Sequence, residues 1–354
     1  MKSKTPPCDD VSAQTDTMHD LKWFDVRQIG VEGKGWTETE RFYDRLPARA
    51  KGSVTEKLWG RSRSPAGMSA RFTTDAEAIY ARWEPLSDDL GATDTPATSV
   101  SGLDLYARDD SGAWRWLGVG KPETPGMITA MLVEGLEPVR REYVLYLPLS
   151  NAVKSVEMGV NPAVAFEPIA PRTEKPIIFY GTSIVHGGCA SRPGMAYPAI
   201  LGRRLNKPVI NLGFGGSAHS EQELAELLAE LDGCAYVIDP LPNMHAEIIT
   251  KRIEPFVNIL RKAHPDTPIV LVGEPGYPHA LFVTSARQRL SDNRSALRAA
   301  YDRLVTAGTD RLHYIPGDDL YDHDGEATVD GIHPSDVGFL IMADVFEPIL
   351  RTIL

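Results

Sequence analysis

The chain has 354 residues, with 37 Lys and Arg against 48 Asp and Glu, and a formal net charge of −11. Its 42 % hydrophobic and 24 % charged residues are ordinary globular values, which exclude long disordered or collagen-like tracts. No apolar run approaches the roughly 18 residues of a membrane span, and an acidic chain binds phosphate backbones poorly. We therefore expect two domains and neither a membrane nor a nucleic acid as partner.

The N-terminal segment and the cysteines bear on where in the cell the protein works. Residues 1–20 are polar and rich in Asp, Thr and Ser, which predicts a disordered lead-in. They lack the apolar stretch of a signal peptide, so we expect a cytoplasmic protein unless a leader has been removed. The three cysteines, Cys8, Cys189 and Cys234, are too widely spaced for a disulfide framework or a zinc motif.

Residues 21–170 contain short apolar runs that are rich in aromatic and β-branched residues and separated by turn sequences. Such runs predict β-strands, and their spacing predicts an antiparallel β-sandwich. The predicted strands are 78–83, 103–106, 114–117, 143–147 and 156–160. The segment from Pro168 to Pro176 has three prolines, which disfavour helix and interior strand, and we expect a linker there.

From residue 171 to residue 354 the pattern changes to short apolar runs that alternate with amphipathic stretches. The predicted strands are 177–180, 209–212, 236–238, 269–272 and 312–315, and the predicted helices are 196–205, 221–231, 248–263, 285–307 and 336–353. This alternation predicts an α/β fold, a parallel sheet with helices on both faces. Functional residues of such sheets gather at the carboxyl ends of the strands.

Ser183 follows the first of these strands, in the sequence Gly181-Thr-Ser-Ile-Val-His-Gly187. A serine just past a buried strand can point its hydroxyl into a crevice, where it would act as a nucleophile. The commoner role of such a serine is to cap the following helix. The Gly-x-Ser-x-Gly elbow of α/β-hydrolases does not occur in the chain.

The loop after the second strand has two interpretations. Its sequence Gly213-Phe-Gly-Gly-Ser-Ala218 matches the Gly-x-Gly-x-x-Ala dinucleotide fingerprint, and Asp239 lies where a ribose-binding acid is expected. That interpretation predicts a nucleotide-dependent oxidoreductase, although the fingerprint normally opens the first strand–helix unit. Alternatively, the backbone N–H groups of this loop face Ser183.

Two more polar motifs follow later strands. Asn243 lies after the third strand, where its amide can donate to an oxyanion or simply form a turn. Asp330 and His333 stand three residues apart just before Pro334, which is well placed to begin the last helix. Such a pair can hold an imidazole as a general base, although an Asp-x-x-His sequence is also common as a surface pair.

Other candidates carry weaker signals. His186 and His219 also follow strands and are candidates for substrate contact, although a loop histidine is the commoner case. The Asp-His-Asp run at 322–324 resembles a metal ligand cluster but has no partner motif, which favours a solvated turn. Cys189 has no neighbouring feature that marks a nucleophile.

Taken in order, Ser183, Gly216, Asn243 and the pair Asp330 and His333 resemble the four blocks of the SGNH (GDSL-type) hydrolase superfamily. The resemblance implies a flavodoxin-like sheet and a catalytic triad of Ser183, Asp330 and His333. It also implies an oxyanion hole formed by Ser183, Gly216 and Asn243, with no metal or cofactor.

Two positions depart from the family's pattern. Thr182 stands where Asp is usual before the serine, and Leu241-Pro-Asn-Met244 replaces the usual Gly-x-Asn-Asp. The second departure bears on the geometry of the loop that carries the asparagine.

The first half of the chain carries a second resemblance. Ser101-Gly-Leu-Asp-Leu-Tyr106 is similar to the Gly-x-Asp-Leu-Tyr signature of a β-sandwich domain that precedes SGNH domains in one bacterial subgroup. That subgroup consists mainly of carbohydrate esterases that remove acetyl groups, and it has a relative that is an acyltransferase. We therefore expect a serine esterase for short acyl esters, with a small molecule or oligosaccharide as partner.

The sequence leaves three alternative functions and the oligomeric state open. The alternatives are an acyltransferase that uses the same triad, the oxidoreductase, and a carbohydrate-binding module with an inactive catalytic half. Whether the chain forms a homo-oligomer is a separate open question.

Overall fold

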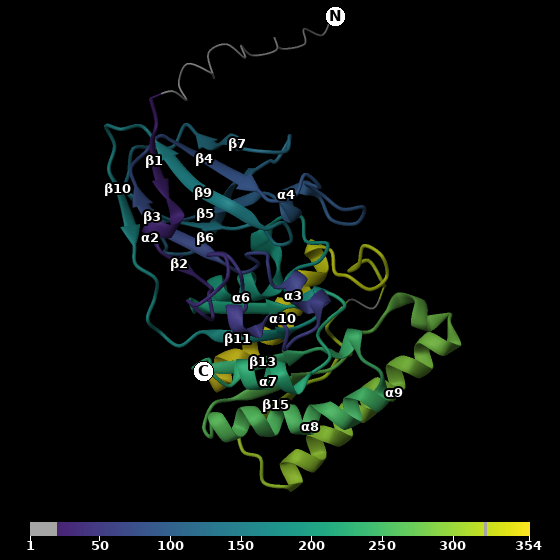
Figure 1. The fold of residues 1–354 in the computed structure, drawn as a ribbon. Coiled ribbons are helices and arrows are strands. Elements are labelled where there is room, and N and C mark those ends of the chain that lie inside the picture. The colour runs from purple at the N-terminus through teal and green to yellow at the C-terminus, as the bar shows by residue number, and fades with distance from the viewer. Residues whose placement is uncertain (1–19, 322–323) are drawn as a thin grey trace, which may run out of the picture.

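The computed structural model describes residues 20–321 and 324–354, and its two halves lie one above the other (Figure 1). The predicted lead-in up to residue 19, Cys8 and two residues of the 322–324 run lie outside the described residues. Among the described residues, no helix is long and apolar enough to cross a membrane.

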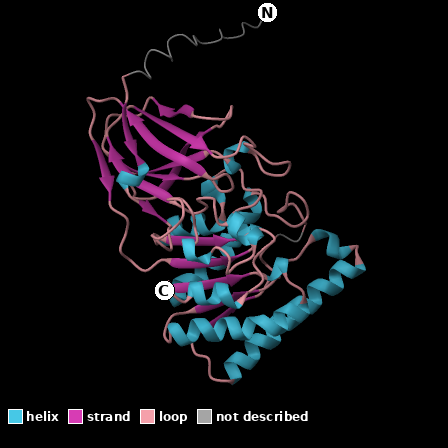
Figure 2. Ribbon diagram, in the orientation of Figure 1, coloured by secondary structure: helices cyan, strands magenta, loops and turns pink. Residues whose placement is uncertain are grey.

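Two antiparallel sheets form the first half (Figure 2). The first sheet has the order β1-β9-β4-β7, and the second has the order β10-β3-β8-β5-β6, with β2 added beside β3. The strands are β1 (Lys22–Asp25), β2 (Val31–Glu32), β3 (Ser69–Thr74), β4 (Ala78–Pro85), β5 (Leu103–Arg108), β6 (Trp114–Gly120), β7 (Ile128–Glu134), β8 (Arg141–Tyr146), β9 (Val153–Val160) and β10 (Phe166–Ile169). The short helices here are α2 (Val26–Ile29), α3 (Glu56–Arg61) and α4 (Ala97–Val100).

The core of this sandwich follows from strand alternation. In β4, Ile79, Ala81 and Trp83 are fully buried while the residues between them are partly exposed, because successive side chains of a strand point to opposite faces. The Trp83 ring nitrogen donates a hydrogen bond to the Ser101 carbonyl at 2.7 Å, so the polar N–H of this buried indole has a hydrogen-bond partner. The predicted antiparallel sandwich is confirmed.

One sequence expectation needs correction. Pro168 and Ile169, the first residues of the predicted linker, belong to strand β10, which pairs only with β3 among the described strands. A strand at the edge of a sheet tolerates proline because the missing N–H faces no partner. The connection between the two halves therefore begins at Ala170, after this edge strand.

A parallel sheet forms the second half. Its strands are β11 (Ile177–Gly181), β12 (Val209–Gly213), β13 (Ala235–Asp239), β14 (Ile269–Val272) and β15 (Leu312–Ile315). Their order, β12-β11-β13-β14-β15, is the flavodoxin-like order 2-1-3-4-5. Ligands bind such sheets where the order reverses, at the carboxyl ends of β11 and β13. The predicted flavodoxin-like fold class is confirmed.

Helices cover both faces of this sheet (Figures 1 and 2). They are α5 (Ser183–His186), α6 (Tyr197–Leu205), α7 (Gln222–Leu228), α8 (Ala246–Ala263), α9 (Thr284–Thr306) and α10 (Asp336–Ile353). In β11, Ile178 and Tyr180 pack against α7, α8 and α9, whereas Ile177 and Phe179 pack against α6 and α10. All five residues of β11 are buried, as expected for a strand covered on both faces.

The packing does not follow the sequence boundary between the halves. Much of the segment 33–68 lies against the parallel-sheet half, where Leu46 and Leu58 join its hydrophobic core, while Tyr43 and Met68 remain in the sandwich core. The ring nitrogen of Trp36 donates to the Glu230 carboxylate at 2.8 Å. This excursion brings residues from early in the chain close to the carboxyl end of β12.

A second contact between the halves uses the buried carboxylate of Asp104. It accepts hydrogen bonds from Arg192 Nη1 at 2.9 Å and from the Gly194 N–H at 2.8 Å, and its other oxygen accepts from Trp116 Nε1 at 2.9 Å. Asp104 is the acid of the Gly-x-Asp-Leu-Tyr signature, while Arg192 and Gly194 lie on the loop between α5 and α6. The signature residue therefore docks the sandwich onto that loop.

We expect Asp104→Ala to lower the free energy of unfolding by about 3 kcal/mol, because it leaves the partly buried Arg192 charge and the Gly194 N–H without their carboxylate. Urea unfolding measures the loss. The matched control is Glu167→Ala, which breaks an exposed pair with Arg140 and should cost less than about 1 kcal/mol. Equal losses in the two variants would contradict the docking role of Asp104.

Candidate active site

Ser183 is the first residue of the short helix α5, directly beyond the carboxyl end of β11. Thr182, rather than Ser183, caps this helix, because its hydroxyl oxygen accepts the Ile184 N–H at 3.2 Å. The capping role that the sequence allowed for Ser183 is thus filled by the residue before it. The Ser183 hydroxyl is free to point out of the helix.

Three side chains from the two ends of the second half meet in a hydrogen-bonded row. Ser183 Oγ lies 2.8 Å from His333 Nε2, and His333 Nδ1 lies 2.7 Å from Asp330 Oδ2. A proton on Nδ1 leaves Nε2 as the acceptor, which is the arrangement a general base needs. The imidazole is about a quarter exposed, so a substrate can reach it.

The loop before α10 fixes the imidazole. Asp330 Oδ1 accepts the backbone N–H groups of Ile332 at 2.9 Å and of His333 at 2.7 Å. Gly331 has a φ of +86°, a conformation that a residue with a side chain rarely adopts, and it allows the tight turn. The Val329 N–H donates to the His333 carbonyl at 2.9 Å and closes the loop.

Burial and hydrogen bonding act on Asp330 in opposite directions. Burial raises the pKa of its carboxyl, but the hydrogen bonds from His333 and Ile332 outweigh it, so the pKa is lower than its ordinary value. The carboxylate therefore stays charged at neutral pH, where it can stabilise a protonated imidazole.

The glycine loop after β12 packs beside the serine. A methyl group added at Gly215 would lie 3.3 Å from Ser183 Cβ, so this loop leaves no room for a side chain between itself and Ser183. Gly216 has a φ of +62°, and its carbonyl accepts Lys57 Nζ at 2.8 Å. The structure therefore places the Gly216 loop beside Ser183, and Lys57 of α3 contacts this loop at Gly216.

Asn243 ends a short 3₁₀ helix, Leu241–Asn243, beyond β13. Its side-chain amide donates to the Ala218 carbonyl at 3.3 Å, so this loop contacts the glycine loop. Arg289 of α9 donates to the Pro242 carbonyl at 3.1 Å and holds the loop from behind. Asn243 thus lies with the other strand-end residues, but its observed contact is to the glycine loop and not to Ser183.

Sequence reasoning missed a fully buried arginine under this site. Arg45 Nη1 donates to the carbonyls of Asn211 at 3.1 Å and Gly213 at 2.7 Å, and the guanidinium stacks over the Phe214 ring. It comes from the 33–68 excursion, 166 residues before Asn211, and no local pattern marks it. Arg45 fixes the end of β12 from which the glycine loop starts.

The two other candidate histidines do not join the triad. Burial, together with the nearby charge of Arg45, lowers the pKa of His186 to about 3, so this imidazole is neutral. Its ring nitrogens contact Ser150 Oγ and the Gly213 carbonyl, each at 3.2 Å. His219 contacts the Glu221 carboxylate at 3.1 Å.

Asp239 does not fit the dinucleotide interpretation. It is 2 % exposed, its carboxylate accepts the Tyr197 hydroxyl at 3.0 Å, and burial raises its pKa to about 8. A ribose-binding acid needs an accessible carboxylate at the strand end, which this residue does not offer.

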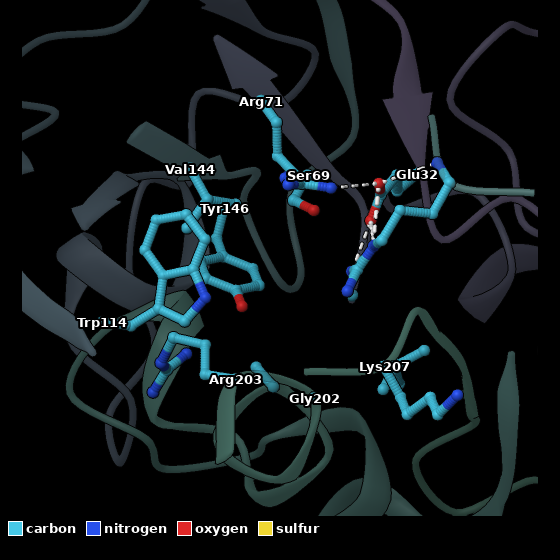
Figure 3. Close-up of a pocket in the computed structure, with 13 residues that line it drawn as sticks. Glu32, Ser69, Arg71, Trp114, Val144, Tyr146, Gly202, Arg203 and Lys207 are labelled. Carbon is cyan, nitrogen blue, oxygen red and sulfur yellow. Dashed lines mark hydrogen bonds and ion pairs between the residues drawn. The ribbon is translucent and has the colours of Figure 1, made fainter. Parts of the chain in front are cut away.

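A cavity of about 30 Å³ lies between the two halves but contains no residue of the triad (Figure 3). Glu32, at the edge of this cavity, forms ion pairs with Arg172 and Arg71, and a dashed line in Figure 3 marks the pair with Arg71. Because its lining residues come from both halves, this cavity belongs to the contact between the halves and not to the site around Ser183.

Comparisons with known proteins identify the family of each half of the chain. The model of the GDSL-like lipase/acylhydrolase family matches residues 174–351, and the model of the N-terminus of SGNH-hydrolase-type esterases, named GxDLY, matches residues 21–166. A search of curated proteins gave no match.

Solved structures resemble the whole chain. A GDSL-like protein from Bacteroides ovatus is 33 % identical, with a TM-score of 0.89, over 94 % of this chain and 98 % of its own. The salicylyl-acyltransferase SsfX3 of a tetracycline pathway shares the fold with a TM-score of 0.72 and 18 % identity, over the same shares. A family two carbohydrate esterase from Cellvibrio japonicus does so with a TM-score of 0.58 and 13 % identity, again over 94 % and 98 %. The chain therefore belongs to the GDSL-like lipase/acylhydrolase family of SGNH hydrolases and carries the GxDLY N-terminal domain of SGNH-type esterases.

Proposed function

We propose that the protein is a serine esterase that hydrolyses short acyl esters, with an acetylated carbohydrate as its substrate class. The observation that carries the proposal is the hydrogen-bonded row from Asp330 through His333 to Ser183, with distances of 2.7 and 2.8 Å. The carbohydrate part is supported by the subgroup that the N-terminal signature resembles and by esterases of that class with the same fold.

The first half-reaction transfers the acyl group to the serine. His333 Nε2 takes the Ser183 proton while Ser183 Oγ forms a bond to the ester carbonyl carbon. Asp330 holds the proton on Nδ1 and stabilises the imidazolium. The tetrahedral intermediate collapses as the carbon–alkoxide bond breaks, and His333 returns its proton to the leaving alcohol.

Three donors are proposed for the oxyanion of that intermediate. They are the backbone N–H groups of Ser183 and Gly216 and the side-chain amide of Asn243. The Gly216 loop lies against Ser183, and the Asn243 loop is hydrogen-bonded to it, which supports this assignment. One such donor is typically worth about 3 kcal/mol. The Asn243 amide would exchange its bond to Ala218 for the oxyanion.

The second half-reaction releases the acyl group to water. His333 removes a proton from a water molecule whose oxygen attacks the acyl-enzyme carbonyl, and Ser183 leaves with the proton returned by His333. If a second alcohol took the place of water, the same steps would make the protein an acyltransferase. No step requires a metal or an organic cofactor.

A panel of esters tests this function. We expect p-nitrophenyl acetate and an acetylated xylo-oligosaccharide to release acetate, with activity falling as the acyl chain lengthens. Chromatography of the products, with glycerol as a competing acceptor, separates hydrolysis from transfer. Free acetate as the main product supports the esterase, whereas acetylglycerol as the main product would favour the acyltransferase.

A further inference from the structure

One segment of the sandwich reaches the triad. It is the connection between β4 and α4, which carries Asp94 and Thr95. A carboxylate oxygen of Asp94, Cys189 Sγ and a ring nitrogen of His333 all lie within 4.8 Å of one another. The sandwich therefore contributes a negative charge next to the catalytic imidazole.

The segment is anchored to the loop that follows Ser183. The Thr95 hydroxyl donates to Asp94 Oδ1 at 3.0 Å, and its oxygen accepts the Cys189 N–H at 3.2 Å. Thr98 Oγ1 donates to the Ser191 carbonyl at 2.6 Å. Asp94 is exposed, and within residues 20–321 and 324–354 no ion pair involves it. Its charge is thus held in place and not neutralised by a neighbour.

The chemistry of the triad decides which part of a substrate meets Asp94. His333 must give its proton to the leaving alkoxide, so the alcohol part of the ester lies beside the imidazole. In the proposed mechanism the carbonyl oxygen binds instead at the Gly216 loop. Asp94 lies beside His333 and Cys189, at the loop that follows Ser183, so in this mechanism it adjoins the alcohol and not the carbonyl oxygen.

We propose that Asp94 is a specificity residue that selects the alcohol part of the ester by charge. It favours esters of cationic or hydroxyl-rich neutral alcohols and disfavours esters of anionic alcohols. This inference rests on the proposed esterase function. If the Asp94 carboxylate and a unit charge on the alcohol lie about 5 Å apart, Coulomb's law predicts a change in ester affinity of roughly fourfold in water-like surroundings. At an effective dielectric constant near 20 the change is about a few hundredfold. For an exposed carboxylate we expect about fourfold for each charge, and therefore roughly tenfold or more between a cationic and an anionic ester.

Three acetyl esters that differ in the charge of the alcohol test the proposal. They are acetylcholine, its neutral isostere 3,3-dimethylbutyl acetate, and 3-acetoxypropanoate. The measurement is the ratio of kcat/KM for the cationic ester to kcat/KM for the anionic ester, in the wild type and in Asp94→Asn. EDTA is present throughout, because Asp, Cys and His side chains also bind zinc, which would reverse the local charge.

We expect Asp94→Asn to lower that ratio by about tenfold or more. Asp89→Asn removes the same charge from the same connection and should leave the ratio within twofold of the wild type. The ratio of p-nitrophenyl acetate to p-nitrophenyl butyrate, which share an alcohol, should also stay within twofold in Asp94→Asn.

Two results would overturn the inference alone. One is an unchanged charge ratio in Asp94→Asn, and the other is an equal shift in Asp89→Asn, provided that Ser183→Ala still abolishes hydrolysis of the neutral ester. Retained hydrolysis by Ser183→Ala would instead overturn the esterase function and this inference with it.

Discussion

Ser183→Ala should lower kcat/KM for p-nitrophenyl acetate by about 10⁴–10⁶-fold, because it removes the atom that forms the acyl-enzyme. The loss should appear in kcat, since the substitution leaves the binding surface in place. Steady-state kinetics measures it, and circular dichroism with thermal unfolding verifies that the variant is folded.

The matched control is Ser111→Ala, which removes a hydroxyl from an exposed turn of the sandwich. Its activity should equal that of the wild type. A Ser183→Ala enzyme that kept its activity within tenfold of the wild type would contradict nucleophilic catalysis by this residue.

Asp330→Asn should lower kcat by about 10⁴-fold while the loop keeps its shape. An asparagine amide can donate to His333 Nδ1, which would move the ring proton to Nε2 and leave no acceptor for the Ser183 proton. Asp324→Asn, in the same connection, is the control and should retain activity. Equal kcat values for Asp330→Asn and the wild type would show that the carboxylate is not needed.

Asp330→Asn should also change how the free energy of unfolding depends on pH. The folded-state pKa of Asp330 is below its ordinary value, so its ionised form stabilises the protein above about pH 4. That contribution disappears as the pH falls through the folded-state pKa. The difference in unfolding free energy between wild type and Asp330→Asn should therefore be largest near pH 7 and shrink on acidification below pH 4. Urea titrations at several pH values measure it.

Local patterns predicted most of the second half of the fold. The predicted helix at 336–353 coincides with α10, and the strands at 269–272 and 312–315 coincide with β14 and β15. These elements have continuous apolar runs or strong helical periodicity, because they are buried on one or both faces. The meeting of Ser183, His333 and Asp330 was also predictable, since strand ends of a parallel sheet converge on one edge, whereas their catalytic roles stay a prediction.

The contacts between distant segments were not predictable in this way. Arg45 and Asp94 lie in irregular connections, and each acts on a residue about 100 or more positions away in the sequence. Neither periodicity nor capping marks such a residue, because its contacts form only when the folded halves bring distant segments together. Strand β3 was missed for a related reason, since its Ser, Thr and Arg residues weaken the apolar alternation.

The assignment of the oxyanion donors depends on the same long-range packing. The glycine loop lies beside Ser183 because Arg45 and β12 hold it there, and the Asn243 loop is held by Arg289. The roles of Gly216 and Asn243 stay predictions, because their hydrogen bonds to an oxyanion form only with a bound substrate.

The central claim, that Ser183 is activated by His333 to form a covalent intermediate, is tested most directly by mass spectrometry after treatment with a fluorophosphonate. One phosphonyl group per chain, found on the peptide that contains Ser183 and absent in His333→Ala over the same time, is the expected result. An adduct on another residue such as Cys189, or equal labelling of Ser183 without His333, would contradict the claim.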